Sequence, residues 1–402
     1  MSGALPTLRG YARTDGRKGI RNVLVVAYLV ECAHHVARAI AAPLAGEGVH
    51  LIGFPGCYPN AYARTMMERL CTHPNVGAVL LVSLGCEGFD QRSLVRAIEA
   101  SDRPVRVIGI QAAGGTRKSI DAGRAWVDAL LPQLADAATV DMRVDELVVG
   151  TICGGSDATS GLTANPAMGV AFDLLVDAGA KTLFEETGEL IGMEHLMAER
   201  AATPALGDAL KATVAKAARY YATLGYASFA PGNADGGLTT IEEKSLGAYA
   251  KSGQSRIDGI VKPGIEPPRG GLYLLDVVPD GEVRFGFPNI NDNAEIAELI
   301  ACGAQVILFS TGRGSVVGSA IAPVIKVCAN PDTYRRMEDD MDVDAGRILE
   351  GRATLPEVGR EIFDLIGAVA CGAATRSEAL GHQEFILTYK SFEPLGPACL
   401  PV

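Results

Sequence analysis

The chain has 402 residues, of which 48% are hydrophobic and 21% charged, and its formal net charge is −11. This length predicts two or three domains, and the composition is that of a globular protein. The negative charge opposes phosphate backbones and so excludes nucleic acid as an expected partner, although a local basic pocket can still bind a small anion.

Neither a leader segment nor a membrane span is apparent in the sequence. The first residues lack an apolar core and no run of 18 apolar residues occurs, so we expect a cytoplasmic protein that contacts no membrane. Nine cysteines scattered over this length are not the framework of a small disulfide-rich module. We therefore expect reduced thiols that are free to bind metal.

Three apolar runs in the first third of the chain predict buried strands, at residues 21–30, 77–84 and 105–110. A helix is expected over residues 32–42, between the first two. Strands that are apolar on both faces are typical of a parallel sheet covered by helices. Ligands bind beyond the carboxyl ends of such strands, so the residues that follow each strand matter most.

The pattern repeats further along the chain. We predict an α/β fold of two Rossmann-like parallel-sheet units with a linking helical and loop region. The expected divisions are a first α/β domain (1–140), a central motif-rich catalytic region (141–251) and a C-terminal α/β domain (252–402), with the proline- and glycine-rich stretch 252–271 as a linker. Further strands are expected at residues 145–152, 181–184, 272–278, 305–310 and 323–327, and helices at 166–179, 194–200 and 206–224.

The richest polar turn follows the strand that ends near Cys153. Backbone amides in such a turn, followed by a helix, favour an anion, and the side chains add hydrogen bonds to substrate hydroxyls. The alternative is that Asp157 or Asn165 only caps a helix. The side chains expected to bind substrate here are Ser156, Asp157, Ser160 and Asn165.

Four carboxylates and one imidazole follow the next strand, within residues 184–195. Such groups bind divalent metals or remove a proton beside a carboxylate. We predict catalytic roles for Glu186, Glu189 and His195, against the alternative of a solvated helix face.

Three cysteines end or follow apolar runs: Cys57, Cys86 and Cys153. If their strands are neighbours, the thiols would converge and hold iron. The alternative is that each is a small core residue, because free cysteine often is.

Two later loops carry cations. Residues 230–244 open a helix, which accounts structurally for Thr239 or Thr240 and leaves Asn233 as a substrate contact and Lys244 as a catalytic group that stabilises an enediolate-like intermediate. The strand that ends near Ser310 delivers Thr311 and Arg313 on a glycine loop, where arginine can bind a carboxylate in two parallel hydrogen bonds.

These motifs, in their order, resemble the altronate and galactarate dehydratase family, and the resemblance covers nearly the whole chain. The matching segments are residues 10–22 (GYARTDGRKGIRN), 84–87 (LGCE), 153–157 (CGGSD), 163–166 (TANP), 186–195 (ETGELIGMEH), 231–244 (PGNADGGLTTIEEK) and 311–314 (TGRG).

The resemblance implies a hydro-lyase that removes water from a sugar acid by β-elimination and yields a 2-keto-3-deoxy acid. It implies a divalent metal, foremost Fe²⁺, with Mn²⁺ as an alternative and an iron–sulfur cluster less favoured. Because family members carry a small N-terminal domain, in some as a separate subunit, we expect a small partner subunit, and also a homo-oligomer.

The sequence has features of more than one reaction. Residues 378–388 resemble the large subunit of sulfolactate sulfo-lyase, which releases sulfite, and residues 277–293 depart from the dehydratase pattern. A third reading is a carboxylate-binding subunit that needs the small partner for catalysis. A weaker similarity to iron–sulfur dihydroxyacid dehydratases supports Cys57, Cys86 and Cys153 as one ligand set.

Overall fold

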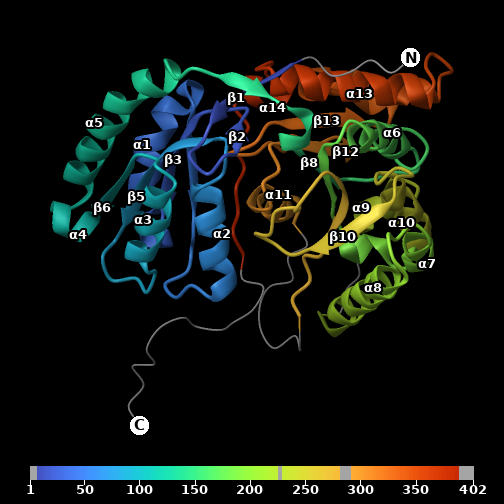
Figure 1. The fold of residues 1–402 in the computed structure, drawn as a ribbon, viewed down its shortest axis with the longest axis horizontal. Coiled ribbons are helices and arrows are strands. Elements are labelled where there is room, and N and C mark those ends of the chain that lie inside the picture. Colours follow the sequence, from blue (N-terminus) through green and yellow to red (C-terminus); the bar gives the residue numbers. More distant parts are fainter. Residues whose placement is uncertain (1–6, 225–228, 281–290, 389–402) are drawn as a thin grey trace, which may run out of the picture.

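The computed structural model describes residues 7–224, 229–280 and 291–388. Two parallel β-sheets, each covered by helices, lie side by side, and a small antiparallel sheet lies near the helix α13 (Figure 1). The predicted α/β class with two parallel-sheet units is confirmed.

The first sheet has the strand order β4-β3-β5-β6, and every neighbouring pair is parallel. Its strand β5 is buried along its whole length because its side chains are apolar or small. Helices α1 and α5 cover one face, and α2 and α3 cover the other. The elements are β3 (Val23–Tyr28), α1 (His34–Ala41), β4 (Val49–Gly53), α2 (Ala61–Cys71), β5 (Val76–Ser83), α3 (Gln91–Ala100), β6 (Val105–Gly109), α4 (Ile110–Ala113) and α5 (Thr116–Ala135).

The second sheet has seven parallel strands in the order β10-β11-β9-β8-β12-β13-β14. Helices α6 and α13 pack on one face and α11 on the other. The elements are β8 (Val148–Cys153), α6 (Ala164–Asp177), β9 (Lys181–Phe184), β10 (Ile257–Val261), β11 (Gly271–Leu275), α11 (Asp292–Ala301), β12 (Val306–Thr311), β13 (Val324–Cys328), β14 (Val343–Asp344) and α13 (Leu355–Ala370).

Between β9 and β10 the chain leaves the second sheet in a helical excursion, α7 to α10, which Figure 1 shows beside the sheet edge. Thr240 begins α10 as its N-cap, because its hydroxyl accepts the backbone N–H of Glu243. The remaining elements are β1 (Leu8–Ala12), β2 (Lys18–Gly19), β7 (Val140–Met142), α7 (Glu194–Glu199), α8 (Pro204–Leu224), α9 (Pro231–Asp235), α10 (Ile241–Ala250), α12 (Pro331–Arg336) and α14 (Arg376–Leu380).

Helices α2 and α11 join the two sheets. Met66 of α2 and Ile300 of α11 belong to one buried apolar cluster with Val79 of β5 and Ile307 of β12. The two sheets therefore share a core, and the burial of this apolar surface holds them together.

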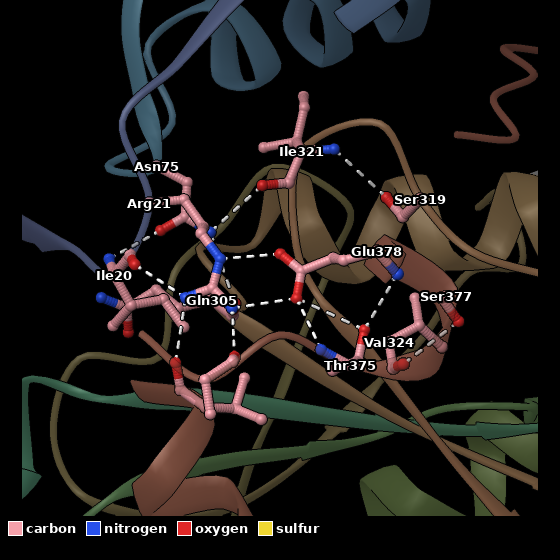
Figure 2. A network of polar contacts seen from close by, with 12 residues as sticks. Ile20, Arg21, Asn75, Gln305, Ser319, Ile321, Val324, Thr375, Ser377 and Glu378 are labelled. Carbon is pink, nitrogen blue, oxygen red and sulfur yellow. Dashed lines mark hydrogen bonds and ion pairs between the residues drawn. The ribbon is translucent and has the colours of Figure 1, made fainter. Parts of the chain in front are cut away.

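A polar network reinforces the joint (Figure 2). Arg21 donates two hydrogen bonds to the carboxylate of Glu378, at 2.7 and 2.9 Å, and a third, of 2.9 Å, to the carbonyl of Val369. Asn75 accepts from the backbone N–H of Ile20 and donates to the carbonyl of Ile321. Residues near the start of the chain are thereby tied to its C-terminal helices.

The basic motif at residues 10–22 is structural in this fold. Arg13 donates to the carbonyl of Pro74, Arg17 to that of Thr72, and Arg103 to that of His73. Together they satisfy the backbone of the loop between α2 and β5, as buried carbonyls require.

The observed strands change one predicted division. Strands from both sides of residue 251 hydrogen-bond in the seven-stranded sheet, so that boundary separates no two sheets. The stretch 252–271 is not a linker throughout, because β10 lies within it. Among the helices of the described residues, none is long and apolar enough to cross a membrane.

Candidate active site

Two neighbouring strands of the second sheet bring the central side chains together. Cys153 is the last residue of β8, and Glu186 follows the adjacent strand β9 by two residues. Glu189 lies in the short 3₁₀ turn Thr187–Leu190 that comes next. Carboxyl ends of parallel strands meet at one sheet edge. Glu186 and Glu189 therefore lie beside Cys153, although they follow it by 33 and 36 positions in the sequence.

The thiol and the two carboxylates form a compact group. The Sγ of Cys153 lies 3.0 Å from Glu186 Oε1 and 3.3 Å from Glu189 Oε2. The possible ligand atoms of these three residues all lie within 4.8 Å of one another, and among the described residues no other histidine, cysteine or carboxylate side chains form such a group. Burial raises the pKa of the Cys153 thiol, and the charge of Glu189 adds to this effect.

Two lysines hold the other oxygen of each carboxylate. Lys251 forms an ion pair with Oε2 of Glu186, and Lys244 forms one with Oε1 of Glu189. Lys251 is 1% exposed and Glu186 is 5% exposed, so this pair is fully removed from water. Burial opposes the charged form of Lys244, but the charges of Glu189 and Cys153 outweigh it and raise the pKa of Lys244.

A cavity of about 710 Å³ opens above the thiol. Its walls carry cations, carboxylates and hydrogen-bond donors, which is the lining expected for a small hydroxylated anion. The polar side chains that line it are Cys153, Ser156, Glu189, Asn233, Lys244, Asp292 and Arg313.

Asp292 is the second carboxylate in this cavity wall. It is the first residue of α11, and its carboxylate lies against the Cα of Gly154, since a Cβ there would be 2.3 Å from Oδ2. Burial, followed by the charge of Glu189, raises the pKa of Asp292 to about 6.

Several predicted substrate contacts face this cavity. Ser156 lies 3.4 Å from the Cys153 sulfur through its hydroxyl, and its carbonyl accepts a hydrogen bond from Asn233. Asn233 also accepts from Lys244 at 3.3 Å. Arg313 is exposed and donates to the carbonyl of Gly232 at 2.6 Å, which places its guanidinium at the cavity wall.

Three other predicted contacts organise loops instead. Asp157 accepts from the backbone of Thr159 at 2.9 Å and from Asn330 at 3.0 Å, so its two oxygens are used within the protein. Ser160 accepts the backbone N–H of Asp157, and Thr311 accepts that of Gly314. A structural role for Asp157, the alternative to substrate binding, therefore accounts for these contacts.

Asn165 lies beside the main cavity. It lines a smaller pocket of about 170 Å³ that shares Ser156 and Lys244 with the larger one. Its Nδ2 donates to the carbonyl of Gly247, while its buried Oδ1 has no hydrogen-bond partner among the described residues. A buried oxygen without a partner is suited to accept a hydrogen bond from a ligand.

The structure does not bring His195 or two of the three cysteines to the site. His195 is exposed on α7 and does not line the cavity, which fits the alternative of a solvated helix face. Cys57 and Cys86 follow strands of the first sheet, are exposed, and lie outside the donor group around Cys153. The three-thiolate set is therefore not formed here, because the strands that carry these cysteines belong to different sheets.

Two residues of the site were missed by sequence reasoning. Lys251 ends a helix and looks like an ordinary surface lysine in sequence, yet it is buried. Asp292 lies in residues 277–293, whose sequence departs from the dehydratase pattern and contains no motif that predicts a site. Its position as the first residue of a helix, directly after the N-cap Asn291, is the only local signal.

Comparisons with known proteins identify the family of the chain. The domain family described as D-galactarate/Altronate dehydratase, C-terminal, matches residues 144–392, and the one described as D-galactarate dehydratase/Altronate hydrolase, second domain, matches residues 10–135. The chain belongs to the galactarate/altronate dehydratase family. The resemblance found in its motifs, and the prediction that it is a lyase of this family, are thus confirmed.

Individual relatives in the galactarate/altronate dehydratase family differ in their reactions. The chain is 35% identical to the (2R)-sulfolactate sulfo-lyase subunit beta of Chromohalobacter salexigens, over 95% of this chain and 97% of the relative. It is 33% identical to the galactarate dehydratase (L-threo-forming) of Escherichia coli, over 91% of this chain and 73% of the relative. The altronate dehydratase of the same organism is 30% identical over 94% and 76%.

Proposed function

We propose that the chain is the large catalytic part of a metal-dependent lyase that eliminates water from a sugar acid, an aldonate or hexarate such as altronate or galactarate, to give a 2-keto-3-deoxy acid. The observation that carries this proposal is the cavity in which Cys153 and Glu189 lie beside Lys244, Asp292 and Arg313. Potential metal donors, two cations and a carboxylate with a raised pKa thus face one space of substrate size.

The donor set fits a divalent ion. Ligand bonds of about 2.0–2.3 Å imply ligand atoms roughly 3–4 Å apart, and the Cys153 sulfur lies 3.0 and 3.3 Å from the oxygens of Glu186 and Glu189. A thiolate with two carboxylates suits Fe²⁺, with Mn²⁺ as the alternative. Such an ion would supply a Lewis acid that polarises a substrate oxygen.

The protein's own residues account for the rest of the elimination. Arg313 and Lys244 bind the substrate carboxylate, and Lys244 stabilises the negative charge that develops on it when the neighbouring C–H bond breaks. Asp292 takes that proton, because a pKa of about 6 makes its carboxylate a stronger base than an ordinary aspartate while it is still mostly ionised at neutral pH. The C–O bond at the next carbon breaks, and the proton held by Asp292 passes to the departing hydroxyl, which leaves as water. The resulting enol then tautomerises to the ketone.

Lys251 and Lys244 position the two carboxylates. Each binds the oxygen that faces away from Cys153, which fixes the orientation of Glu186 and Glu189 toward the thiol. Partners that orient ligands in this way tune metal sites.

A second candidate is the elimination of sulfite from sulfolactate. It is favoured by one observation: the chain covers 97% of the sulfo-lyase subunit but 73 to 77% of the dehydratases. Since that relative is named a subunit, we also propose a small partner subunit for this chain. The third reading, a carboxylate-binding subunit without chemistry of its own, makes the partner indispensable.

The test is an assay of the purified chain with Fe²⁺ against a panel of hexarates, aldonates and sulfolactate, with keto-acid and sulfite measured in parallel. We expect keto-acid without sulfite, abolished by a chelator and by Cys153→Ala. Sulfite from sulfolactate would select the second candidate. Activity that appears only with a co-expressed small subunit would select the third, and turnover that survives both chelation and Cys153→Ala would overturn the metal mechanism.

A further inference from the structure

A second set of thiols lies on the first sheet. Cys32 follows β3, Cys57 follows β4 and Cys86 follows β5, each within four residues of the strand end. These strands are neighbours, since β3 pairs with both β4 and β5. All three cysteines are therefore at the carboxyl edge of one parallel sheet, where ligand sites of such folds occur.

Backbone hydrogen bonds tie the three cysteine loops together. The N–H of Glu31 donates to the carbonyl of Pro55 at 3.1 Å, which joins the loops after β3 and β4. The N–H of Gly88 donates to the carbonyl of Cys57 at 2.8 Å, which joins the loops after β4 and β5. The loop of Cys86 is also fixed internally, because its N–H donates to the carboxylate of Glu87 at 3.1 Å.

The exposure of these thiols distinguishes them from core cysteines. Cys32, Cys57 and Cys86 are exposed, whereas Cys71 and Cys302 are buried in the apolar core. Burial raises the pKa of Cys71 and Cys302 to about 12, so those two remain inert thiols. Of the four exposed cysteines in the described residues, three share this one edge.

The spacing of the sulfur atoms decides what they can bind. A single ion with metal–sulfur bonds of about 2.3 Å needs sulfur atoms about 3.8 Å apart. In the part of the chain that the structure describes, Cys32, Cys57 and Cys86 do not form a group with ligand atoms within 4.8 Å. One ion would therefore not reach all three sulfurs in this arrangement, and the hydrogen-bonded loops that carry them favour a cluster of several iron and sulfide ions, which spans a wider gap.

We propose that Cys32, Cys57 and Cys86 bind an iron–sulfur cluster at the carboxyl edge of the first sheet. Three thiolates from three loops would hold it, and its remaining position would be open to a ligand other than cysteine. This site is separate from the one around Cys153, and the proposal holds whichever reaction the chain catalyses. In this site Cys32 takes the place that Cys153 has in the ligand set predicted from the sequence.

The test uses the full chain, purified without oxygen and reconstituted with Fe²⁺ and sulfide. We expect bound iron together with acid-labile sulfide, and a broad visible absorption from thiolate-to-iron charge transfer. Cys32→Ser, Cys57→Ser and Cys86→Ser should each lose most of the sulfide and the absorption. Cys371→Ser is the matched control, because Cys371 is exposed but follows α13, and it should retain both.

Cys153→Ser separates this proposal from the proposed function. It should lose turnover while it retains the sulfide of the cluster. Circular dichroism of the variants before reconstitution shows whether each serine chain is folded. Iron uptake without sulfide, or sulfide that survives all three serine substitutions in folded protein, would overturn the proposal.

Discussion

Each of the two central carboxylates contacts a thiol with one oxygen and a lysine with the other. Glu186 and Glu189 turn one oxygen to Cys153 and the other to Lys251 or Lys244. Because the Lys251 pair is buried, removal of one partner leaves a charge without compensation in a medium of low polarity.

We therefore expect Lys251→Met to lower the free energy of unfolding by about 3–5 kcal/mol. The double variant Lys251→Met with Glu186→Gln should recover part of this loss, because no buried charge then lacks a partner. Urea denaturation followed by circular dichroism measures both. Lys211→Met, at an exposed position of α8, is the control. Equal free energies of unfolding for Lys251→Met and Lys211→Met would refute the argument.

The proton-transfer residue is the second prediction at this scale. Asp292→Asn keeps the shape of the side chain but removes the base, so we expect kcat to fall by about 100-fold or more with little change in stability. His195→Gln should retain wild-type turnover, since His195 is exposed and outside the cavity wall. Steady-state assays compare both with Asp339→Asn, at an exposed site. A loss in His195→Gln that exceeds the loss in Asp292→Asn would assign the base to the histidine.

Sequence patterns located the site at the level of elements but not every side chain. Strand ends are visible in sequence because buried strands are continuous apolar runs, which placed Cys153 and Glu186 correctly at one edge. Which sheet a strand joins depends on the pairing of distant segments. The sequence therefore predicts Cys57 beside Cys153, although the strand before Cys57 lies in the other sheet. Burial of a lysine such as Lys251 likewise depends on tertiary packing.

The turn after β8 depends on glycine at one position. A Cβ on Gly154 would lie 2.4 Å from the ring of Phe309, which is fully buried and cannot move aside. Gly154→Ala should therefore lower the free energy of unfolding by about 1–3 kcal/mol and reduce turnover, since it also displaces Asp292.

Gly232→Ala is the matched control for this turn. Gly232 also lines the cavity, but a Cβ there meets no atom within 4 Å. Thermal unfolding and kcat/KM of the two variants should differ clearly. If both alanine variants behaved alike, the close packing of Gly154 against Phe309 would not limit the site.

At the scale of the whole molecule, the turn between α2 and β5 forms hydrogen bonds with both halves of the fold. This turn accepts hydrogen bonds from Arg13 and Arg17. Asn75 of the same turn donates to the carbonyl of Ile321, which lies between β12 and β13 of the second sheet (Figure 2). His73 is buried in this turn, and its Nδ1 accepts the backbone N–H of Asn75 at 3.1 Å. Burial, followed by the charges of Arg17 and Arg103, holds the pKa of His73 well below its usual value.

This depressed pKa makes the stability of the whole chain depend on pH. Below about pH 6.5 the unfolded state binds a proton at His73 that the folded state refuses, so the free energy of unfolding falls as the pH is lowered. The neutral His73 has no effect on the pH dependence of the free energy of unfolding above that pH. Below it, this free energy falls by up to about 1.4 kcal/mol per pH unit. His73→Asn should flatten this dependence between about pH 5 and 7, while His35→Asn, at an exposed position of α1, should not. Urea denaturation across this range measures the slopes, and equal slopes for wild type and His73→Asn would show that another group governs the acid sensitivity.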